Sequence, residues 1–353
     1  MSRTAAQRPH PTKKASLIAG LGLLALLGCT TDPPAPIAAA APAPALPPAP
    51  QLSRADFSGV FEDTGPSVVG VVAGRTTAGR FQPERTGTGL VWDAEGHVVT
   101  SDHLVADAEE VRVRSVRGQV FRAQLVADDG PTDVAVLRIP PGLPPVRLGR
   151  AEDLKPGQWV AAVGNPYGLD HSITVGVVSA LGRRDLPSGG PRYGDFIQAD
   201  LNVNPGNSGG PLLDTAGRVV GLTTAMIGGA RGLAFASPIE QVEIVVTRLL
   251  RDGRFIRGFA GLFVKPMTWA AARAAGLEDL EGARVRAVVA GGPAAEAGLA
   301  PGDILLKFGG EAVEDDDALP WLVAATRPGT EVDVELVRGT ERMTVKLTVI
   351  EAR

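Results

Sequence analysis

"NVNPGNSGGPLLD", residues 202–214, is the stretch that decides the fold of this chain. Its glycines and asparagines are typical of a tight turn between two strands, and they are also residues that could shape a backbone pocket around a nucleophile, Ser208. A simple turn needs no partner elsewhere. A serine nucleophile needs a histidine base and a carboxylate that orients it, so the choice depends on where those residues stand in the chain.

The order of histidine and serine excludes one fold and favours another. Residues 206–210 satisfy the G-x-S-x-G pattern of the α/β-hydrolase nucleophile turn, a short pattern with many false positives. In that fold the base histidine follows the serine, whereas here every histidine precedes Ser208: His10, His97, His103 and His171. The order histidine, aspartate, serine belongs to the chymotrypsin-type double β-barrel, so a mainly β fold is predicted.

Three histidines are candidates for the base, because His10 lies in the N-terminal apolar leader. His103 follows the strand-like run "HVVTSD" and begins a turn, where functional residues are commonly presented by a rigid scaffold. His97 and His171 are expected at exposed loop ends. From position alone, His103 is the best candidate and the other two remain open.

An orienting carboxylate must hold the imidazole tautomer and stabilise the imidazolium. Asp133 opens the apolar run "VAVLRI" and is the preferred candidate. Asp102 is adjacent to His103 along a strand and should point the other way. Asp128 and Asp129 remain as solvated alternatives.

The composition agrees with short strands and many turns. The chain has 353 residues, enough for more than one domain, and contains 44 Gly and 29 Pro against 10 Phe, 4 Trp and 2 Tyr. The formal net charge is −4, and it becomes −8 without residues 1–28, which carry four Lys/Arg and no Asp/Glu. This gives no electrostatic case for nucleic acid. No phosphate loop of the GxxxxGK[ST] type is present, and neither a cofactor nor a metal is expected.

The first 28 residues are predicted to be an export signal of the lipoprotein type. Basic residues precede the apolar run "SLIAGLGLLALLGC", which is shorter than the ~20 apolar residues of a membrane-spanning helix. It ends at Cys29, the only cysteine, and "LLGC" resembles a bacterial lipobox except that Leu27 replaces the usual small residue. The alternatives are a cleaved secretory signal with an incidental cysteine, or a short membrane anchor. Residues 29–52 are expected to be a disordered Pro/Ala-rich tether.

Beyond the tether, patterning predicts two folded domains, 53–253 and 254–353. The first contains short β-branched runs typical of a sandwich or barrel pair, at 68–72, 89–92, 98–101, 111–116, 120–126, 134–139, 160–163, 173–181, 196–199, 219–223 and 232–236. A long helix closes it, with Ser237 as predicted N-cap, Pro238 as first residue, Glu240 completing a capping box and Gly253 as the stop. The second domain alternates strands and helices and is expected to be α+β.

Several blocks resemble the HtrA/Deg family of trypsin-like serine proteases over about residues 57–350. They are "GTGLVWDAEGHVVTSDHLV", "DDGPTDVAVLRI", "GQWVAAVGNPYGL", "TVGVVSAL" and "FIQADLNVNPGNSGGPLLDTAGRVVGLTTA". The C-terminal unit, with "GFAGL", "GGPAAEAGLAPGDILLKFGGEAV" and "RPGTEVDVELVRG", is similar to the family's PDZ domain. The resemblance implies His103 as general base, Asp133 as its orienter and Ser208 as nucleophile. The backbone N–H groups of Gly206 and Ser208 would then face the developing oxyanion.

Two segments depart from the family pattern near the implied substrate pocket. Leu201 and Asn202 stand where small residues are usual. In the segment that contains Leu233, Ala234 stands where a glycine is usual. The family's preference for small aliphatic residues before the cut is therefore in doubt.

The PDZ resemblance implies a peptide groove beside the strand that starts near Gly261. The residues expected to meet a peptide are Phe259, Ala260, Gly261 and Leu262, with backbone N–H groups offered to a terminal carboxylate. Pro320 falls in the helix that would flank this groove, so that helix is expected to start late or bend. The alternative is a domain used for packing or control without peptide capture.

The resulting hypothesis is an ATP-independent serine endopeptidase that degrades unfolded or misfolded extracytoplasmic proteins. The partners expected are unfolded polypeptides, C-terminal peptides at the PDZ domain and a bacterial membrane reached through lipid on Cys29. The outer membrane is preferred because Thr30, not Asp, follows Cys29. The family implies a homotrimer, with Phe57 and Phe61 as contacts. The rivals are a proteolytically silent chaperone or peptide-sensing adaptor on the same scaffold, and an esterase.

Overall fold

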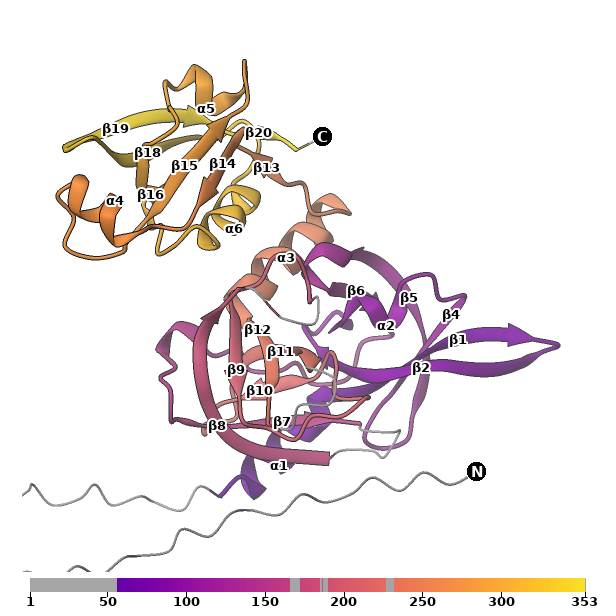
Figure 1. The fold of residues 1–353 in the computed structure, drawn as a ribbon. Helices are drawn as coiled ribbons and strands as arrows, with labels where there is room; N and C mark the ends of the chain where they lie inside the picture. Colours follow the sequence, from indigo (N-terminus) through magenta and orange to yellow (C-terminus); the bar gives the residue numbers. More distant parts are fainter. Residues whose placement is uncertain (1–55, 166–171, 185, 187–189, 227–231, 353) are drawn as a thin grey trace, which may run out of the picture. The chain divides into compact units, whose positions relative to one another are not determined.

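The computed structural model describes residues 56–165, 172–184, 186, 190–226 and 232–352 (Figure 1). Cys29, the leader, the tether, His10 and His171 lie outside the described residues. Within those ranges strands predominate, and the prediction of a mainly β, double-barrel fold followed by an α+β domain is confirmed.

The first barrel closes in the order β1-β2-β3-β6-β5-β4. Its antiparallel pairs include β1 with β2 and, completing the closure, β1 with β4. A bulge near Gly74 sits where a side chain would meet the Gln82 carbonyl oxygen at 2.0 Å. The strands are β1 (Val68–Thr77), β2 (Arg80–Val91), β3 (His97–Thr100), β4 (Glu110–Arg114), β5 (Val120–Asp129) and β6 (Val134–Arg138).

The second barrel repeats this architecture in the order β10-β11-β12-β9-β8-β7. Figure 1 draws it in magenta to salmon, against indigo to purple for the first barrel. Closing both sheets removes unpaired strand edges. The strands are β7 (Trp159–Gly164), β8 (Ser172–Arg183), β9 (Phe196–Ala199), β10 (Pro211–Leu213), β11 (Val219–Met226) and β12 (Ala234–Pro238).

Aliphatic side chains fill the protease-side cores, as expected for a chain poor in aromatic residues. One core cluster joins the two barrels, because it contains Leu90 and Val136 of the first and Leu213 and Leu222 of the second. Each of these side chains is fully buried. Burying one such side chain stabilises the fold by about 1.5–3 kcal/mol. The shared core therefore fixes the two barrels against each other. Residues at the junction of the barrels are held by a rigid scaffold.

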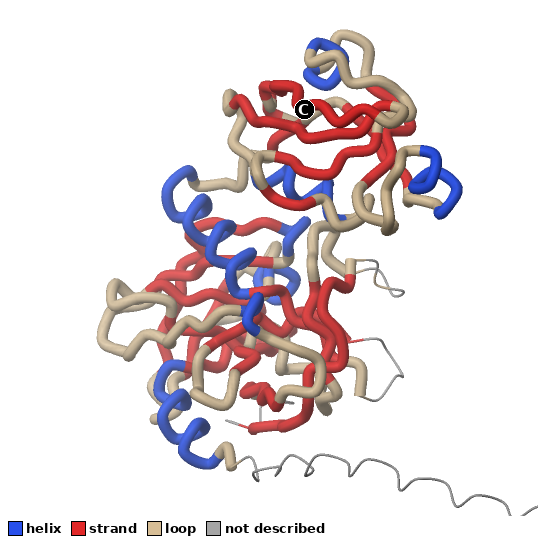
Figure 2. The backbone as a smooth tube through the Cα atoms, turned by 90° about the vertical axis from the view of Figure 1, so that its left-hand side faces the viewer, coloured by secondary structure: helices blue, strands red, loops and turns tan. Residues whose placement is uncertain are grey.

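Helix α3 (Ile239–Asp252) packs on this shared core, with Ile239, Val242, Val246 and Leu249 completely buried as its periodicity predicts. Figure 2 shows it as the longest helix, lying against the strands. Gly253 ends it in the left-handed conformation (φ 69°), as expected.

The predicted capping box at the start of α3 is wrong. Ser237 and Pro238 are the last residues of β12, and no side chain caps the helix. The Glu240 carboxylate instead accepts a hydrogen bond from the Ala151 N–H at 2.8 Å. The strand runs directly into the helix, so the serine is not in a position to turn its side chain onto the first turn.

The C-terminal domain is a small sheet with short helices, drawn in orange to yellow in Figure 1. Its sheet runs β14-β15-β16-β18-β19, with β17 beside β16 and a separate pair β13-β20, so β14 is an edge strand. Its strands are β13 (Gly258–Phe259), β14 (Leu262–Lys265), β15 (Ala283–Val288), β16 (Ile304–Phe308), β17 (Glu311–Ala312), β18 (Glu331–Arg338), β19 (Glu341–Thr348) and β20 (Ile350–Glu351). Its helices are α4 (Trp269–Ala274), α5 (Pro293–Glu296) and α6 (Ala318–Ala325).

Pro320 is tolerated because α6 begins at Ala318, which places the proline in the first turn. N–H groups there have no intrahelical acceptor, so the missing donor costs no helix bond. The remaining short elements are α1 (Ser58–Thr64), η1 (Gly65–Ser67), α2 (Asp102–Val105), η2 (Gly130–Thr132) and η3 (Ala151–Asp153). Among the described helices, none is long and apolar enough to cross a membrane.

Candidate active site

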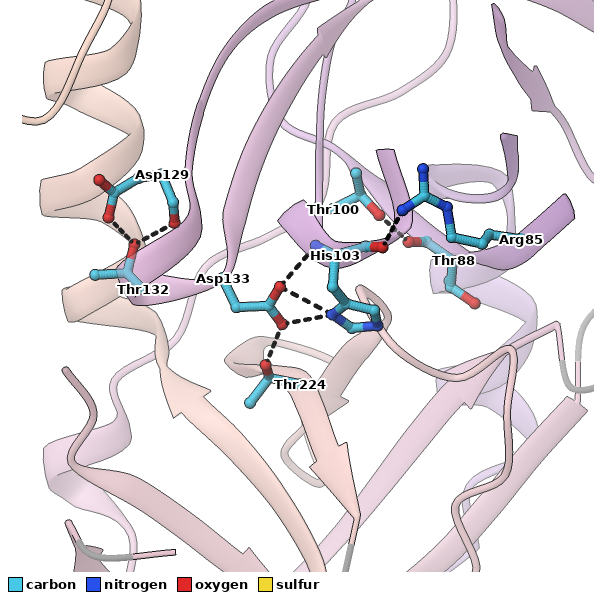
Figure 3. A network of polar contacts seen from close by, with 8 residues as sticks. All are labelled: Arg85, Thr88, Thr100, His103, Asp129, Thr132, Asp133 and Thr224. Atoms are coloured by element: carbon cyan, nitrogen blue, oxygen red, sulfur yellow. Dashed lines mark hydrogen bonds and ion pairs between the residues drawn. The ribbon is translucent and has the colours of Figure 1, made fainter. Parts of the chain in front are cut away.

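His103 and Asp133 meet at the edge of the first barrel (Figure 3). His103 lies in the single turn of α2, directly after β3, and its side chain is about half exposed, at 48%. Its Nδ1 lies 2.9 Å from Asp133 Oδ1 and 3.0 Å from Oδ2, and its backbone N–H donates to Oδ1 at 2.9 Å. With Nδ1–H directed at the carboxylate, Nε2 is left free to accept a proton.

Asp133 is fixed by its backbone as well as by its partners. It is the single residue between η2 and β6 and adopts the left-handed conformation (φ 56°, ψ 43°), which aspartate tolerates better than most residues. The residue is 7% exposed. Thr224 Oγ1, from β11 of the second barrel, donates to Asp133 Oδ2. The carboxylate is therefore fully engaged, by donors from both barrels.

These contacts control the charge of the imidazole. The hydrogen bond to Asp133 raises the pKa of His103 above its ordinary value; burial acts against this, and the negative charges of Asp133 and Asp102 add to it. Arg85 opposes the rise slightly, since its guanidinium binds the carbonyl oxygens of His103 and Ala106. A histidine held beside a carboxylate in this way is a stronger base than a free imidazole.

Ser208 and Gly206 lie in the loop between β9 and β10. Ser208 is half-buried, and no hydrogen bond joins its hydroxyl to His103 in the described part of the chain. Gly206 has φ 108°, a conformation that glycine alone adopts readily. Neither N–H, of Gly206 or of Ser208, donates to any described residue, so both remain available to a ligand oxygen.

The expectation that Asp102 continues the strand is wrong, because Asp102 is the first residue of the helical turn α2 that also contains His103. Asp102 is 9% exposed, and one of its oxygens, Oδ1, has no hydrogen-bond partner among the described residues. Burial raises the pKa of Asp102 to about 7, with further contributions from Asp128, Asp133 and Asp129. Asp128 is exposed as expected, but the expectation that Asp129 is solvated is wrong: it is 6% exposed and binds Thr132 and Arg257.

The other histidine that the structure describes is engaged elsewhere. His97 Nδ1 lies 2.6 Å from Asp93 Oδ2, and its Nε2 lies 2.9 Å from an Arg138 nitrogen. Together with Glu95, Asp93 and His97 have ligand atoms close enough to hold a metal ion. Both ring nitrogens already have partners, so this turn gives no basis for a metal site.

The four pocket candidates do not gather on one surface. Leu201 and Ala234 are 3% exposed and point into the core of the second barrel. Leu233, the residue before β12, packs in a separate cluster against Leu186, Phe196 and Phe235. Asn202 is exposed and donates its N–H to Thr174 Oγ1 at 3.3 Å.

The peptide-binding candidates of the C-terminal domain do lie along one edge. Phe259 ends β13, Gly261 has φ 71°, and Leu262 begins the edge strand β14. The carbonyl of Ala260 accepts from the Ala294 N–H and that of Gly261 from the Val289 N–H. These bonds hold the segment against the domain while one edge of β14 has no strand beside it among the described residues.

Sequence reasoning missed three residues around this site: Arg85, Thr88 and Thr224. Thr224 is the second threonine of "VVGLTT" (219–224), in a block that resembles the family, but nothing in that block shows that it binds Asp133. Thr88 is fully buried and bonds to both Gly206 and Ser208. The block "GTG" at 87–89 is the signal that marks it.

Comparison with known proteins gives the class first. A trypsin-like peptidase domain model matches residues 87–222, and a PDZ domain model matches residues 263–349. The class defined by fold and site is therefore a trypsin-like peptidase domain followed by one PDZ domain.

Similar whole proteins then give the family. The "Probable periplasmic serine endoprotease DegP-like" of Ectopseudomonas mendocina (strain ymp) is 40% identical over 280 residues, covering 78% of this chain and 58% of that protein. The protein of the same name from Pseudomonas fluorescens is 40% identical over 272 residues, covering 76% and 56%. The chain thus spans a little over half the length of the curated relatives it matches.

Solved structures agree. The "HtrA-type protease AlgW with tripeptide" is 33% identical, with a TM-score of 0.72, and the match covers 84% of this chain and 98% of that one. A serine endoprotease from Yersinia pestis is 32% identical, with a TM-score of 0.62 and the same coverage. This chain belongs to the HtrA/Deg family of serine proteases.

Proposed function

We propose that the protein is an ATP-independent serine endopeptidase in which Ser208 is the nucleophile, His103 the general base and Asp133 its orienting carboxylate. The observation that supports this proposal is that the Asp133 carboxylate accepts hydrogen bonds from the His103 ring, on the first barrel, and from Thr224, on the second. Relatives of similar sequence are named serine endoproteases, which supports the same activity here.

The chemistry follows from these positions. Ser208 Oγ attacks the carbonyl carbon of a peptide bond while His103 Nε2 removes its proton, and the carbonyl oxygen becomes an oxyanion that the Gly206 and Ser208 N–H groups can bind. The imidazolium then protonates the leaving amine, which leaves an acyl-serine. Water, deprotonated by the same imidazole, releases the acid. Asp133 keeps its charge throughout and stabilises the imidazolium.

Ser208 and His103 share no hydrogen bond among the described residues, and catalytic hydrogen bonds often tighten only when substrate is present. A serine hydroxyl is a weak nucleophile by itself, so the assignment requires that the two side chains approach on binding.

Ser208→Ala tests the assignment. Residues 53–353 should degrade an unfolded protein, and the variant should lose at least about a thousandfold in kcat, as when any member of such a triad is removed. Thr64→Val, a small change in a buried threonine at the end of α1, is the matched control and should cleave normally.

Equal cleavage by Ser208→Ala and the parent protein would refute the catalytic assignment. If the parent protein never cleaves, while Ser208→Ala still suppresses aggregation fully, the rival chaperone or adaptor function stands instead. Comparing kcat/KM for peptides and small esters separates a peptidase from an esterase.

Unfolded or misfolded extracytoplasmic proteins are the proposed substrates, because similar proteins are named periplasmic serine endoproteases.

The PDZ domain is proposed to take C-terminal peptides at Phe259, Ala260, Gly261 and Leu262, since β14 offers a strand edge. One HtrA-type relative, AlgW, was solved with a decapeptide and with a tripeptide, which supports peptide binding in this architecture. The cleavage preference is proposed to differ from the family's, with exposed Asn202 as the remaining candidate to set it, and a cleavage-site profile tests it.

Location and assembly complete the proposal. Residues 1–28 are proposed as a lipoprotein signal, 29–52 as a tether, 53–253 as the protease domain and 254–353 as the PDZ domain. Lipid on Cys29 would hold the protein at the periplasmic side of a membrane, preferably the outer one, and acyl labelling that persists in Cys29→Ser would refute it.

A homotrimer is proposed with Phe61 as a contact. Phe57, at 6% exposure, offers little surface, and sedimentation as a stable monomer would rule the trimer out.

A further inference from the structure

Thr88 is a buried residue of β2 whose polar groups are all engaged beside the candidate oxyanion site. It has no exposed surface. Its hydroxyl donates to the Gly206 carbonyl at 2.6 Å and accepts from the Asn165 N–H at 3.0 Å. Its backbone N–H donates to the Ser208 carbonyl at 2.9 Å, and its own carbonyl accepts from Thr100 Oγ1 at 2.6 Å. Figure 3 labels the last pair, Thr88 and Thr100, near His103.

The two carbonyls that Thr88 holds belong to Gly206 and Ser208, the residues whose N–H groups have no acceptor among the described residues. Gly206 and Ser208 flank Asn207, so the chain is pinned on both sides of the Asn207–Ser208 peptide that carries the Ser208 N–H. The Asn207 N–H donates back to the Asn204 carbonyl at 3.0 Å, which closes the loop on itself. Thr88, a residue of the first barrel, therefore holds two peptide groups of a loop of the second: the Gly206 carbonyl through its hydroxyl and the Ser208 carbonyl through its backbone N–H.

The surrounding glycines show how closely this loop is seated on Thr88. A Cβ on Gly209 would lie 2.2 Å from the Thr88 carbonyl oxygen, and one on Gly164 would lie 3.1 Å from Thr88 Oγ1. One on Gly210 would approach Thr88 Cγ2 at 3.2 Å. Gly209 and Gly210 of the loop, and Gly164 at the end of β7, are therefore packed closely around Thr88.

We infer that Thr88 is a positioning residue for catalysis: its hydroxyl holds the Gly206–Ser208 loop so that both N–H groups converge on one oxygen position. The inference rests on the proposed function, since it assumes that these N–H groups bind the oxyanion. The hydroxyl is the group that makes threonine specific at this position. Any residue of β2 could make the two backbone bonds, from the N–H to the Ser208 carbonyl and from Thr100 Oγ1 to the carbonyl.

Removing the hydroxyl should affect the transition state more than substrate binding. In Thr88→Val the shape is kept, but the Gly206 carbonyl and the Asn165 N–H are left buried without this partner. The loop can then rotate away to satisfy them, which displaces donors that are each worth about a hundred- to a thousandfold in rate. Binding of the rest of the substrate does not use these donors, so KM should change little.

The experiment compares Thr88→Val, Thr88→Ser and the parent protein on a cleavable peptide. We expect kcat to fall about 10- to 100-fold in Thr88→Val, with KM within about threefold, and to recover to within about threefold in Thr88→Ser, which restores the hydroxyl. The matched control is Thr64→Val, which deletes a hydroxyl that also binds a backbone carbonyl, at 2.7 Å, outside the site. It should change neither parameter.

A peptide trifluoromethyl ketone provides a readout that a purely structural role would not move. Serine adds to its carbonyl and gives a tetrahedral oxyanion, so its Ki should rise in Thr88→Val by about the factor by which kcat/KM falls. The melting temperatures of the Thr88 and Thr64 valine variants establish that both fold. If Thr88→Val does not fold, Thr88→Cys, with a weak thiol donor of similar size, is measured in its place and should show the same loss.

Normal kcat and Ki in the folded valine variant would overturn the inference, as would a loss that appears only in KM or that Thr88→Ser does not restore. A parent protein that cleaves nothing would instead count against the proposed function. The two outcomes can therefore be told apart. If only the inference about Thr88 is wrong, the parent protein cleaves, Ser208 is essential and Thr88 is dispensable. If the proposed function is wrong, the parent protein shows no cleavage at all.

Discussion

The charge on His103 sets the pH at which the proposed reaction begins. The base works only when neutral, that is above its pKa, and the hydrogen bond to Asp133 raises that pKa. The acid limb of kcat/KM should therefore have its midpoint above the ordinary histidine value of ~6.5. Asp133→Asn removes the negative charge, so the limb should move to lower pH while kcat falls by about 10⁴.

A pH profile of initial rates measures both effects, with Asp153→Asn, an exposed carboxylate on η3, as the control that should leave the limb in place. A limb that stays fixed in Asp133→Asn would mean that another group titrates.

At the same scale, the sequence located the candidate triad but not its supports. His103, Asp133 and Ser208 each lie in a short block with its own local pattern. Thr224 and Thr88 act through partners 91 and 118 residues away in the chain. An ordinary threonine in a strand carries no local sign of such a partner, so only the closed barrels reveal it.

Among the elements, β14 offers the sharpest test. It ends the sheet order, and one of its edges has no strand beside it in the part of the chain that the structure describes, so an extended peptide could pair there by main-chain hydrogen bonds. A peptide with a free C-terminus should bind the protein, and C-terminal amidation should weaken binding by tenfold or more, because the carboxylate loses its backbone N–H donors. N-methylation at alternate peptide residues should do the same by removing donors to the strand. Fluorescence anisotropy measures both, and equal binding of the amidated peptide would contradict the proposed carboxylate site.

The elements also show where pattern reasoning succeeds and fails. The buried face of α3 followed from the spacing of Ile239, Val242, Val246 and Leu249, because burial in a helix depends on period. Its start did not follow from Ser237 and Glu240. The hydrogen-bond partner of a carboxylate depends on which groups pack beside it. The Glu240 carboxylate accepts from the N–H of Ala151, 89 residues earlier in the chain, and not from the start of its own helix.

At the scale of the whole molecule, the order of histidine, aspartate and serine was sufficient to choose the double barrel, because only one of the two folds considered allows it. That choice does not determine how the barrels are joined. The barrels are joined by tertiary contacts. These are the common core of Leu90, Val136, Leu213 and Leu222, and the hydrogen bonds that Thr88 and Asp133 make between the barrels. The site is a property of the junction between the barrels, which neither barrel's sequence describes alone.

The stability of this junction should depend on pH through Asp102, which is buried near three other carboxylates, Asp128, Asp129 and Asp133, with His103 next in the chain. Burial raises the folded-state pKa of Asp102 to about 7, whereas the unfolded value is ~3.9. Between those values the folded chain holds a proton that the unfolded chain releases. This contribution is therefore complete below pH ~4 and is lost as the pH rises through about 7.

Asp102→Asn replaces the carboxyl by a neutral group of the same shape. The variant should be more stable than the parent protein at pH 8 and should lose that advantage near pH 4, with melting temperature changing by about 2–4 °C for each kcal/mol. Asp93→Asn is the opposing control. Burial acts to raise the Asp93 pKa, but the hydrogen bonds from His97 outweigh it and the pKa is lowered, so this variant should lose stability at pH 8. Thermal unfolding of the three proteins from pH 4 to 8 decides the matter, and parallel curves for Asp102→Asn and the parent would show that folding does not raise the pKa of Asp102.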